Sequence, residues 1–167
     1  MINPQFEKLA KTLCGHSTKI SAGENVLLAL WDTPVEMAEA LIREVSERGA
    51  FPHVEIGNAR IARALAKSSA GRRLETEAEC ALYKIKKMDA YIAVRGSANI
   101  FETSDVEHSR MAEISKAMKD AVDWRVNKTK WVVLRWPTPS MAQLAQMSTE
   151  AFEDFYFDVC TMDYSRM

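Results

Sequence analysis

The sequence predicts an α/β domain with three layers, in which a mainly parallel sheet of about four or more strands carries helices on both faces. Short apolar segments alternate with amphipathic helical segments along the chain, which is typical of α/β proteins. One apolar segment, residues 25–31, shows no polar alternation, as expected for a strand covered on both faces. The 167 residues are enough for one domain with a substantial core. We therefore expect residues 1–167 to form a single α/β domain.

The first half of the chain predicts two strands among three helices. Asp32 or Thr33 is placed to cap the second helix, and Pro34 suits its first position. The second strand is more polar than the first and contains Pro52, so a sheet edge suits it better than the centre. The expected elements are a helix over 5–16, a strand over 25–31, a helix over 34–48, a strand over 51–57 and a helix over 59–69.

The second half repeats this alternation. A long helix is expected to begin at Ser104 or Asp105. Its inward face is predicted from helical spacing to hold Met111, Ile114, Met118, Ala121 and Val122. The other expected elements are a helix over 74–87, a strand over 89–95 and a buried strand over 130–136.

The stretch 130–156 has the pattern of an exit from the domain. Pro137 and Pro139 end the strand, because proline cannot donate to a sheet ladder. Ser140 and Ser148 are expected to cap the two helices that follow. In the second of these helices, the predicted packing face holds Phe152, Phe155, Tyr156 and Val159, whereas Phe157 points elsewhere and marks a docking surface.

Composition excludes several classes of function. The net charge is −1, and the basic residues are interleaved with acids, so no affinity for nucleic acid is expected. Trp31 and Trp131 lie in predicted buried strands, where core packing explains them better than base stacking. We find no apolar run of membrane-spanning length and no signal-peptide core. With only three cysteines and no CxxC motif, the sequence predicts a cytoplasmic protein without disulfides.

The sequence carries no recognisable catalytic set. His16, His53 and His108 are far apart and outside any HExxH or HxxxH motif, so no metal site is predicted in this chain. Ser104, Asp105 and His108 are the residue types of a hydrolase triad. A helix start explains them better, because a triad depends on tertiary geometry rather than on nearness in sequence.

The loop after the predicted strand 89–95 is the best candidate for a binding site. Parallel strands bring such loops to the carboxyl edge of the sheet, where α/β proteins bind ligands. This loop offers Arg95, Asn99, Glu102 and backbone N–H groups. A plain connecting loop is the competing interpretation. The sequence contains neither GxGxxG nor GxxxxGK[ST], so it gives little support to a nucleotide site.

Several motifs resemble the thermophilic-type metallo-aminopeptidases, the M29 peptidases of the aminopeptidase T and S group. The most specific block runs from the strand through a Pro-Thr-Pro elbow to a Phe-rich helix. Ala22 stands where the family usually has a proline. The matching segments are 22–27 (AGENVL), 95–99 (RGSAN), 104–106 (SDV), 131–139 (WVVLRWPTP), 141–142 (MA), 145–148 (AQMS) and 152–155 (FEDF).

The resemblance implies a two-domain cytosolic exopeptidase that removes N-terminal residues from peptides. It implies two divalent metal ions of zinc or cobalt type, held by Glu, His and Asp ligands of a C-terminal domain that this chain lacks. The chain is then expected to be the non-catalytic N-terminal domain, inactive alone, which walls the peptide cleft and supports a homodimer. Arg95 is expected to meet a peptide carboxylate, and Asn99 a peptide amide.

Two other classes of function remain open from the sequence. One is a stand-alone α/β module that binds a small ligand or nucleotide through the 95–102 loop. The other is a structural domain that associates with itself.

Overall fold

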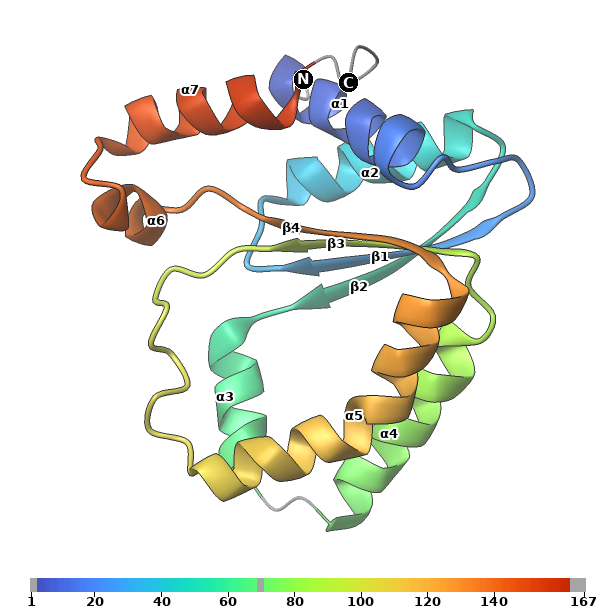
Figure 1. Ribbon diagram of the computed structural model, residues 1–167, viewed down its shortest axis with the longest axis vertical. Helices are drawn as coiled ribbons and strands as arrows, with labels where there is room; N and C mark the ends of the chain where they lie inside the picture. Colours follow the sequence, from blue (N-terminus) through green and yellow to red (C-terminus); the bar gives the residue numbers. More distant parts are fainter. Residues whose placement is uncertain (1–2, 69–70, 163–167) are drawn as a thin grey trace.

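A computed structural model describes residues 3–68 and 71–162 and confirms the three-layer α/β fold. Its sheet is parallel, has four strands and runs in the order β2-β1-β3-β4. Figure 1 shows α1, α2 and α7 over one face of the sheet and α3, α4 and α5 over the other. The strands are β1 Asn25–Trp31, β2 Phe51–Gly57, β3 Ala90–Arg95 and β4 Lys130–Arg135.

The helices agree in number and order with those expected for the described segments. The helix expected over 5–16 consists of α1, which continues directly into the π-helical turn η1. The expected end of the third helix at residue 69 lies outside the described residues. The elements are α1 Pro4–Lys11, η1 Thr12–Ser17, α2 Val35–Glu47, α3 Ala59–Lys67, α4 Gly71–Ile85, α5 His108–Lys128, α6 Pro139–Leu144 and α7 Thr149–Cys160.

The connections between strands change direction between β1 and β3, which makes a topological switch point there. The chain leaves β1 through α2 towards β2, and later returns past β1 through α3 and α4 to reach β3. The crossover helices consequently lie on opposite faces, as right-handed connections require. Loops at the carboxyl ends of β1 and β3 diverge there, and this is where open α/β sheets bind ligands.

Two apolar clusters hold the layers together, one on each face. Alternate residues of β1 and β3 point to opposite faces, so Leu28 and Ile92 join the cluster under α1, α2 and α7. Leu27 and Tyr91 join the cluster under α4 and α5. This double coverage explains why β1 shows no polar alternation.

The strand order confirms one edge prediction and overturns one prediction of burial. β2 forms an edge, as its polar composition indicated. β4 was expected to be a buried strand, but it forms the other edge of the described sheet, and Trp131 is 43% exposed. Trp31 is 37% exposed because it is the last residue of β1. The tryptophan that packs in the core is Trp136, whose ring meets Phe6 edge-to-face at 5.1 Å.

The aromatic face of α7 also differs from the prediction. Phe152 and Tyr156 are buried as expected, but Phe155 and Val159 are exposed. Phe157, which was expected to point away, is 5% exposed and lies 5.8 Å from the ring of Phe6. The physical reason is that α7 covers α1 as well as the strand ends, so its buried face is rotated towards α1. Phe157 therefore marks no docking surface.

Two predicted caps belong to other residues. Neither Asp32 nor Thr33 caps α2; Pro34 occupies the cap position, and α2 has no side-chain cap. α6 is capped by Thr138 rather than Ser140, because the Thr138 hydroxyl accepts from the Met141 N–H. Ser148 caps α7 as predicted.

The long helix α5 starts later and is less buried than expected. It begins at His108 rather than at Ser104 or Asp105. None of its residues is fully buried, and Met111 and Val122 are 37% and 40% exposed. A helix of 21 residues is about 31 Å long, whereas a strand of six residues spans about 20 Å. Only the C-terminal part of α5, with Ala121 and Trp124, therefore reaches the sheet.

Candidate functional site

The carboxyl ends of the four strands form one aligned edge. Trp31 pairs with Gly57 of β2 and with Arg95 of β3, and Arg95 pairs with Arg135 of β4. The backbone ladder continues one residue further, from Asp32 N to Gly57 O at 3.2 Å, from Gly96 N to Trp31 O at 2.7 Å, and from Trp136 N to Arg95 O at 2.9 Å. Side chains at this edge are thus held in fixed register.

Gly96 sets the direction in which the chain leaves β3. A Cβ atom at this position would lie 2.2 Å from the backbone oxygen of Asp32, closer than any side chain tolerates. Glycine is therefore required for the chain to turn this close to β1. Because Gly96 is fixed to β1, Arg95 stands at the sheet edge with its side chain exposed.

Asn99 and Glu102 lie further along the same segment. The Asn99 side-chain oxygen accepts from the Phe101 N–H at 3.0 Å, and the Asn99 backbone oxygen accepts from the Ser97 hydroxyl at 2.7 Å. Within the described part of the chain, the Asn99 amide NH₂ has no acceptor and remains available as a donor. The Asp105 carboxylate first, and the charge of Glu102 to a smaller extent, raise the pKa of the Arg63 guanidinium. Arg95 ends β3 and Asn99 and Glu102 follow it in the chain, but no hydrogen bond or ion pair joins the three in the described structure.

Asp105 anchors the segment 96–107 to α3. Its carboxylate accepts from both Arg63 and Lys67, with Lys67 Nζ at 2.9 Å. The Arg63 hydrogen bond, followed by that of Lys67, holds the pKa of Asp105 well below its usual range. Asp105 is thus a structural anchor rather than a helix cap. Its carboxylate is directed to α3 and not to Ser104 or His108, so the triad residue types are not assembled.

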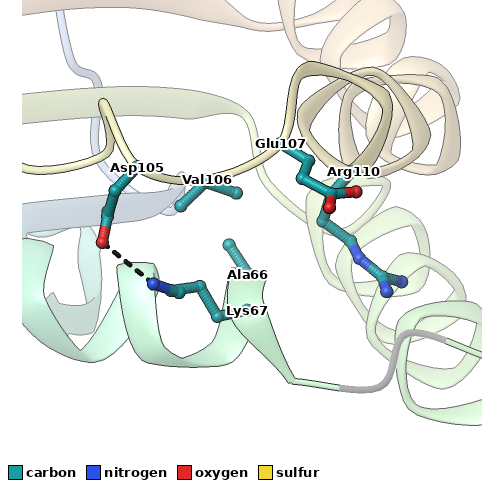
Figure 2. Close-up of a pocket in the computed structure, with 6 residues that line it drawn as sticks. All are labelled: Ala66, Lys67, Asp105, Val106, Glu107 and Arg110. Carbon is teal, nitrogen blue, oxygen red and sulfur yellow. Dashed lines mark hydrogen bonds and ion pairs between the residues drawn. The ribbon is translucent and has the colours of Figure 1, made fainter.

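A polar hollow of about 230 Å³ lies beside this anchor. Figure 2 shows Lys67 and Asp105 joined across one side of it, with Glu107 and Arg110 at the start of α5 on the other. Arg110 also pairs with Glu113 at 3.1 Å. Because its charges are largely matched within the chain, we assign this hollow a structural role. Its lining residues are Ala66, Lys67, Asp105, Val106, Glu107 and Arg110.

The loops after β3 and β4 are tied to each other. The Ser140 hydroxyl donates to the Ser97 backbone oxygen at 2.8 Å and lies 2.9 Å from the Thr138 hydroxyl. The Tyr156 hydroxyl donates to the Arg135 backbone oxygen, so α7 holds the end of β4 from the face of the sheet that α1 and α2 also cover. The proline elbow therefore packs back onto the sheet edge.

Metal ligands are not gathered in the described residues. Within 3–68 and 71–162, no group of three or more His, Cys, Asp or Glu side chains is placed to hold a metal ion. Cys14, Cys80 and Cys160 are free thiols. The same part of the chain has no helix both long and apolar enough to cross a membrane.

Sequence reasoning missed two residues of this edge. Arg135 was treated only as part of the strand, and Asp32 as a possible cap for α2. Asp32 has φ 47° and accepts from Asn58 Nδ2 and, at 2.8 Å, from Ala59 N, so it joins the loop after β1 to the start of α3. For Arg135, a signal was present: both arginines are the last residue of a strand, and adjacent parallel strands bring such residues together.

Comparisons with known proteins agree with this fold. A family model described as thermophilic metalloprotease (M29) matches residues 2–165. The solved structure of wild-type AmpT from Thermus thermophilus superposes with a TM-score of 0.72 at 18% sequence identity. The match covers 94% of this chain and 42% of the AmpT chain. Among curated proteins, none matches the sequence significantly.

Proposed function

Because the chain belongs to the thermophilic metalloprotease family M29, we propose that it is a non-catalytic N-terminal domain of a metal-dependent aminopeptidase. The observation that carries the proposal is the family match over 2–165, combined with the part-length match to AmpT, in which this chain spans 42% of that chain. Metal ions of the kind the family implies do not fit the described residues, which offer no group of ligands. No catalytic step is therefore assigned to this chain.

The proposed role is to form one wall of the peptide cleft and to support a homodimer. The carboxyl edge of the sheet supplies that wall, with Arg95 at the end of β3 and with Asn99 and Glu102 on the segment that follows. Peptide is the substrate, and two divalent ions of zinc or cobalt type are held outside this chain. The protein acts in the cytoplasm, without nucleic-acid or membrane partners. The rigid register of the edge and its exposed arginines support this role.

Two measurements test the proposal. The reading frame beyond Met167 should encode Glu, His and Asp residues able to hold two metal ions. The 167-residue chain should not hydrolyse an aminoacyl chromogenic substrate when zinc or cobalt is added. A stop codon directly after Met167, or metal-dependent turnover by this chain, would contradict the assignment.

A stand-alone binding module is the second candidate, favoured by the switch point between β1 and β3. Saturable binding of a mononucleotide in a calorimetric titration, lost in Arg95→Gln, would support it. A self-association domain is the third, favoured by the exposed apolar side chains of α6 and α7, with Phe155 at 56% and Leu144 at 67% exposure. Sedimentation equilibrium of the chain and of Phe155→Ser would show whether this surface forms a dimer.

A further inference from the structure

We propose that Arg95 and Arg135 together bind the free C-terminal carboxylate of a short peptide. This inference rests on the proposed function, and it adds a second residue and a substrate class to that site. It predicts a preference for peptides short enough for their C-terminus to reach the end of the sheet.

The two arginines are fixed side by side. They are partners in the β3–β4 register, so their side chains leave the sheet on the same face, about 4.8 Å apart at the backbone. Both backbones are held: the Arg95 oxygen accepts from Trp136 N, and the Arg135 oxygen accepts from the Tyr156 hydroxyl. The pair thus stands at a preorganised position.

Neither arginine of this pair has an ion-pair partner among the described residues. None of the ion pairs among the described residues includes Arg95 or Arg135. Two positive charges on neighbouring strands repel each other. An anion between them would remove this repulsion, and the planar guanidinium matches a carboxylate with two parallel hydrogen bonds.

The neighbouring side chain leaves the pair uncovered. A Cβ atom at Gly57 would lie 2.4 Å from the ring of Trp31, so this ring leans over β2 and away from Arg95. No cation–π contact joins Arg95 to Trp31 in the described part of the chain. The ring, 37% exposed, provides an apolar surface over β2 at the same end of the sheet.

The loop geometry favours a carboxylate over a phosphate. Phosphate sites at strand ends use free backbone N–H groups and the start of a helix. Here the Gly96 N–H is bonded to the Trp31 oxygen, and α5 does not begin until His108. The loop after β3 therefore brings no helix start to the pair, and the guanidinium groups are the charged donors at the ends of β3 and β4.

A titration of the 167-residue chain tests the proposal directly. The probes are Ala-Ala-Ala with a free carboxylate and its C-terminal amide, followed through the arginine Nε–H signals by heteronuclear NMR. We expect saturable shifts at Arg95 and Arg135 with the free acid, and at least about tenfold weaker binding of the amide, as expected for a lost charged hydrogen bond. Equal affinities, or no saturable binding of the free acid, would overturn the proposal.

Matched variants distinguish binding by the arginine pair from a general effect of positive charge on the protein. Arg95→Gln and Arg135→Gln should each weaken binding of the free acid about tenfold. The affinity of Arg135→Lys for the free acid should lie between that of these variants and that of the wild type. Arg72→Gln, an exposed arginine on α4, should bind as the wild type does. Far-ultraviolet circular dichroism and thermal unfolding check that each variant is folded. The proposal would be refuted by an unchanged affinity of Arg135→Gln for the free acid, or by tighter binding of inorganic phosphate than of the tripeptide.

The outcomes separate this inference from the proposed function. If the reading frame beyond Met167 encodes the metal ligands but the tripeptide does not bind, the arginine assignment fails and the family role stands. If the tripeptide binds through both arginines but a stop codon follows Met167, the binding site stands and the aminopeptidase role fails.

Discussion

Replacing Gly96 with alanine should destabilise the fold by about 2 kcal/mol, within a range of about 1–3.6 kcal/mol. The added Cβ would lie 2.2 Å from the Asp32 oxygen and 3.2 Å from the Trp31 oxygen, and both are backbone atoms that cannot rotate away. Overpacking of this kind costs about 1–3 kcal/mol, and displacing the 2.7 Å bond from Gly96 N to Trp31 O costs about 1 kcal/mol more. Reduced freedom of the unfolded chain offsets about 0.4–1 kcal/mol of this loss.

Urea unfolding monitored by circular dichroism measures this change. For a chain of 167 residues, a loss of about 2 kcal/mol should also lower Tm, measured by heating, by about 4–8 °C. Gly15→Ala is the matched control, because the atoms nearest to its Cβ belong to the flexible end of Arg48. We expect that control to stay within about 1 kcal/mol of the wild type. If Gly96→Ala also unfolds within about 0.5 kcal/mol of the wild type, the close approach of the two loops does not fix the sheet edge as argued.

Three further predictions follow from the packing and charges. Phe157→Ala should lower the free energy of unfolding in urea by about 3–5 kcal/mol, because Phe157 is only 5% exposed. Phe155 is 56% exposed, so Phe155→Ala should change stability by less than about 0.5 kcal/mol. Similar losses in the two variants would contradict the observed face of α7. Burial raises the pKa of the Cys14 thiol to about 12, so at pH 8 a thiol reagent should modify exposed Cys80 quickly and Cys14 only on unfolding. Because the folded-state pKa of Asp105 is lowered from 3.8, its anchoring contribution should be intact at neutral pH and lost as pH falls below 3.8. Asp105→Asn should therefore increase proteolysis of 96–107 at neutral pH. Protection of this segment equal to that in the wild type would refute the anchor.

The sequence determined the fold class because its signals are local. The apolar run of β1 and the Ser148 cap each act over a few neighbouring residues, and the structure reproduces both. The edge position of β2 could also be inferred, because Pro52 and the polar residues of that strand suit few other places in a sheet.

Tertiary structure alone decided which surfaces meet. The strand order placed β4 at an edge and exposed Trp131, although its sequence is as apolar as a central strand. Likewise, α7 buries Phe157 rather than Phe155, because the position of α1 selects the face that packs. Helical spacing defines which residues share a face, but it contains no information about the partner of that face.

The arrangement of the candidate site shows the same division. Arg95 and its loop were predicted from the sequence, because a loop after a parallel strand must emerge at the carboxyl edge. Arg135 became its neighbour only through the β3–β4 register, and Asp105 became an anchor only when α3 came within reach. These relations join residues about 40 positions apart. Sequence determines which side chains are available at such distances, and the packing of the whole sheet decides which of them meet.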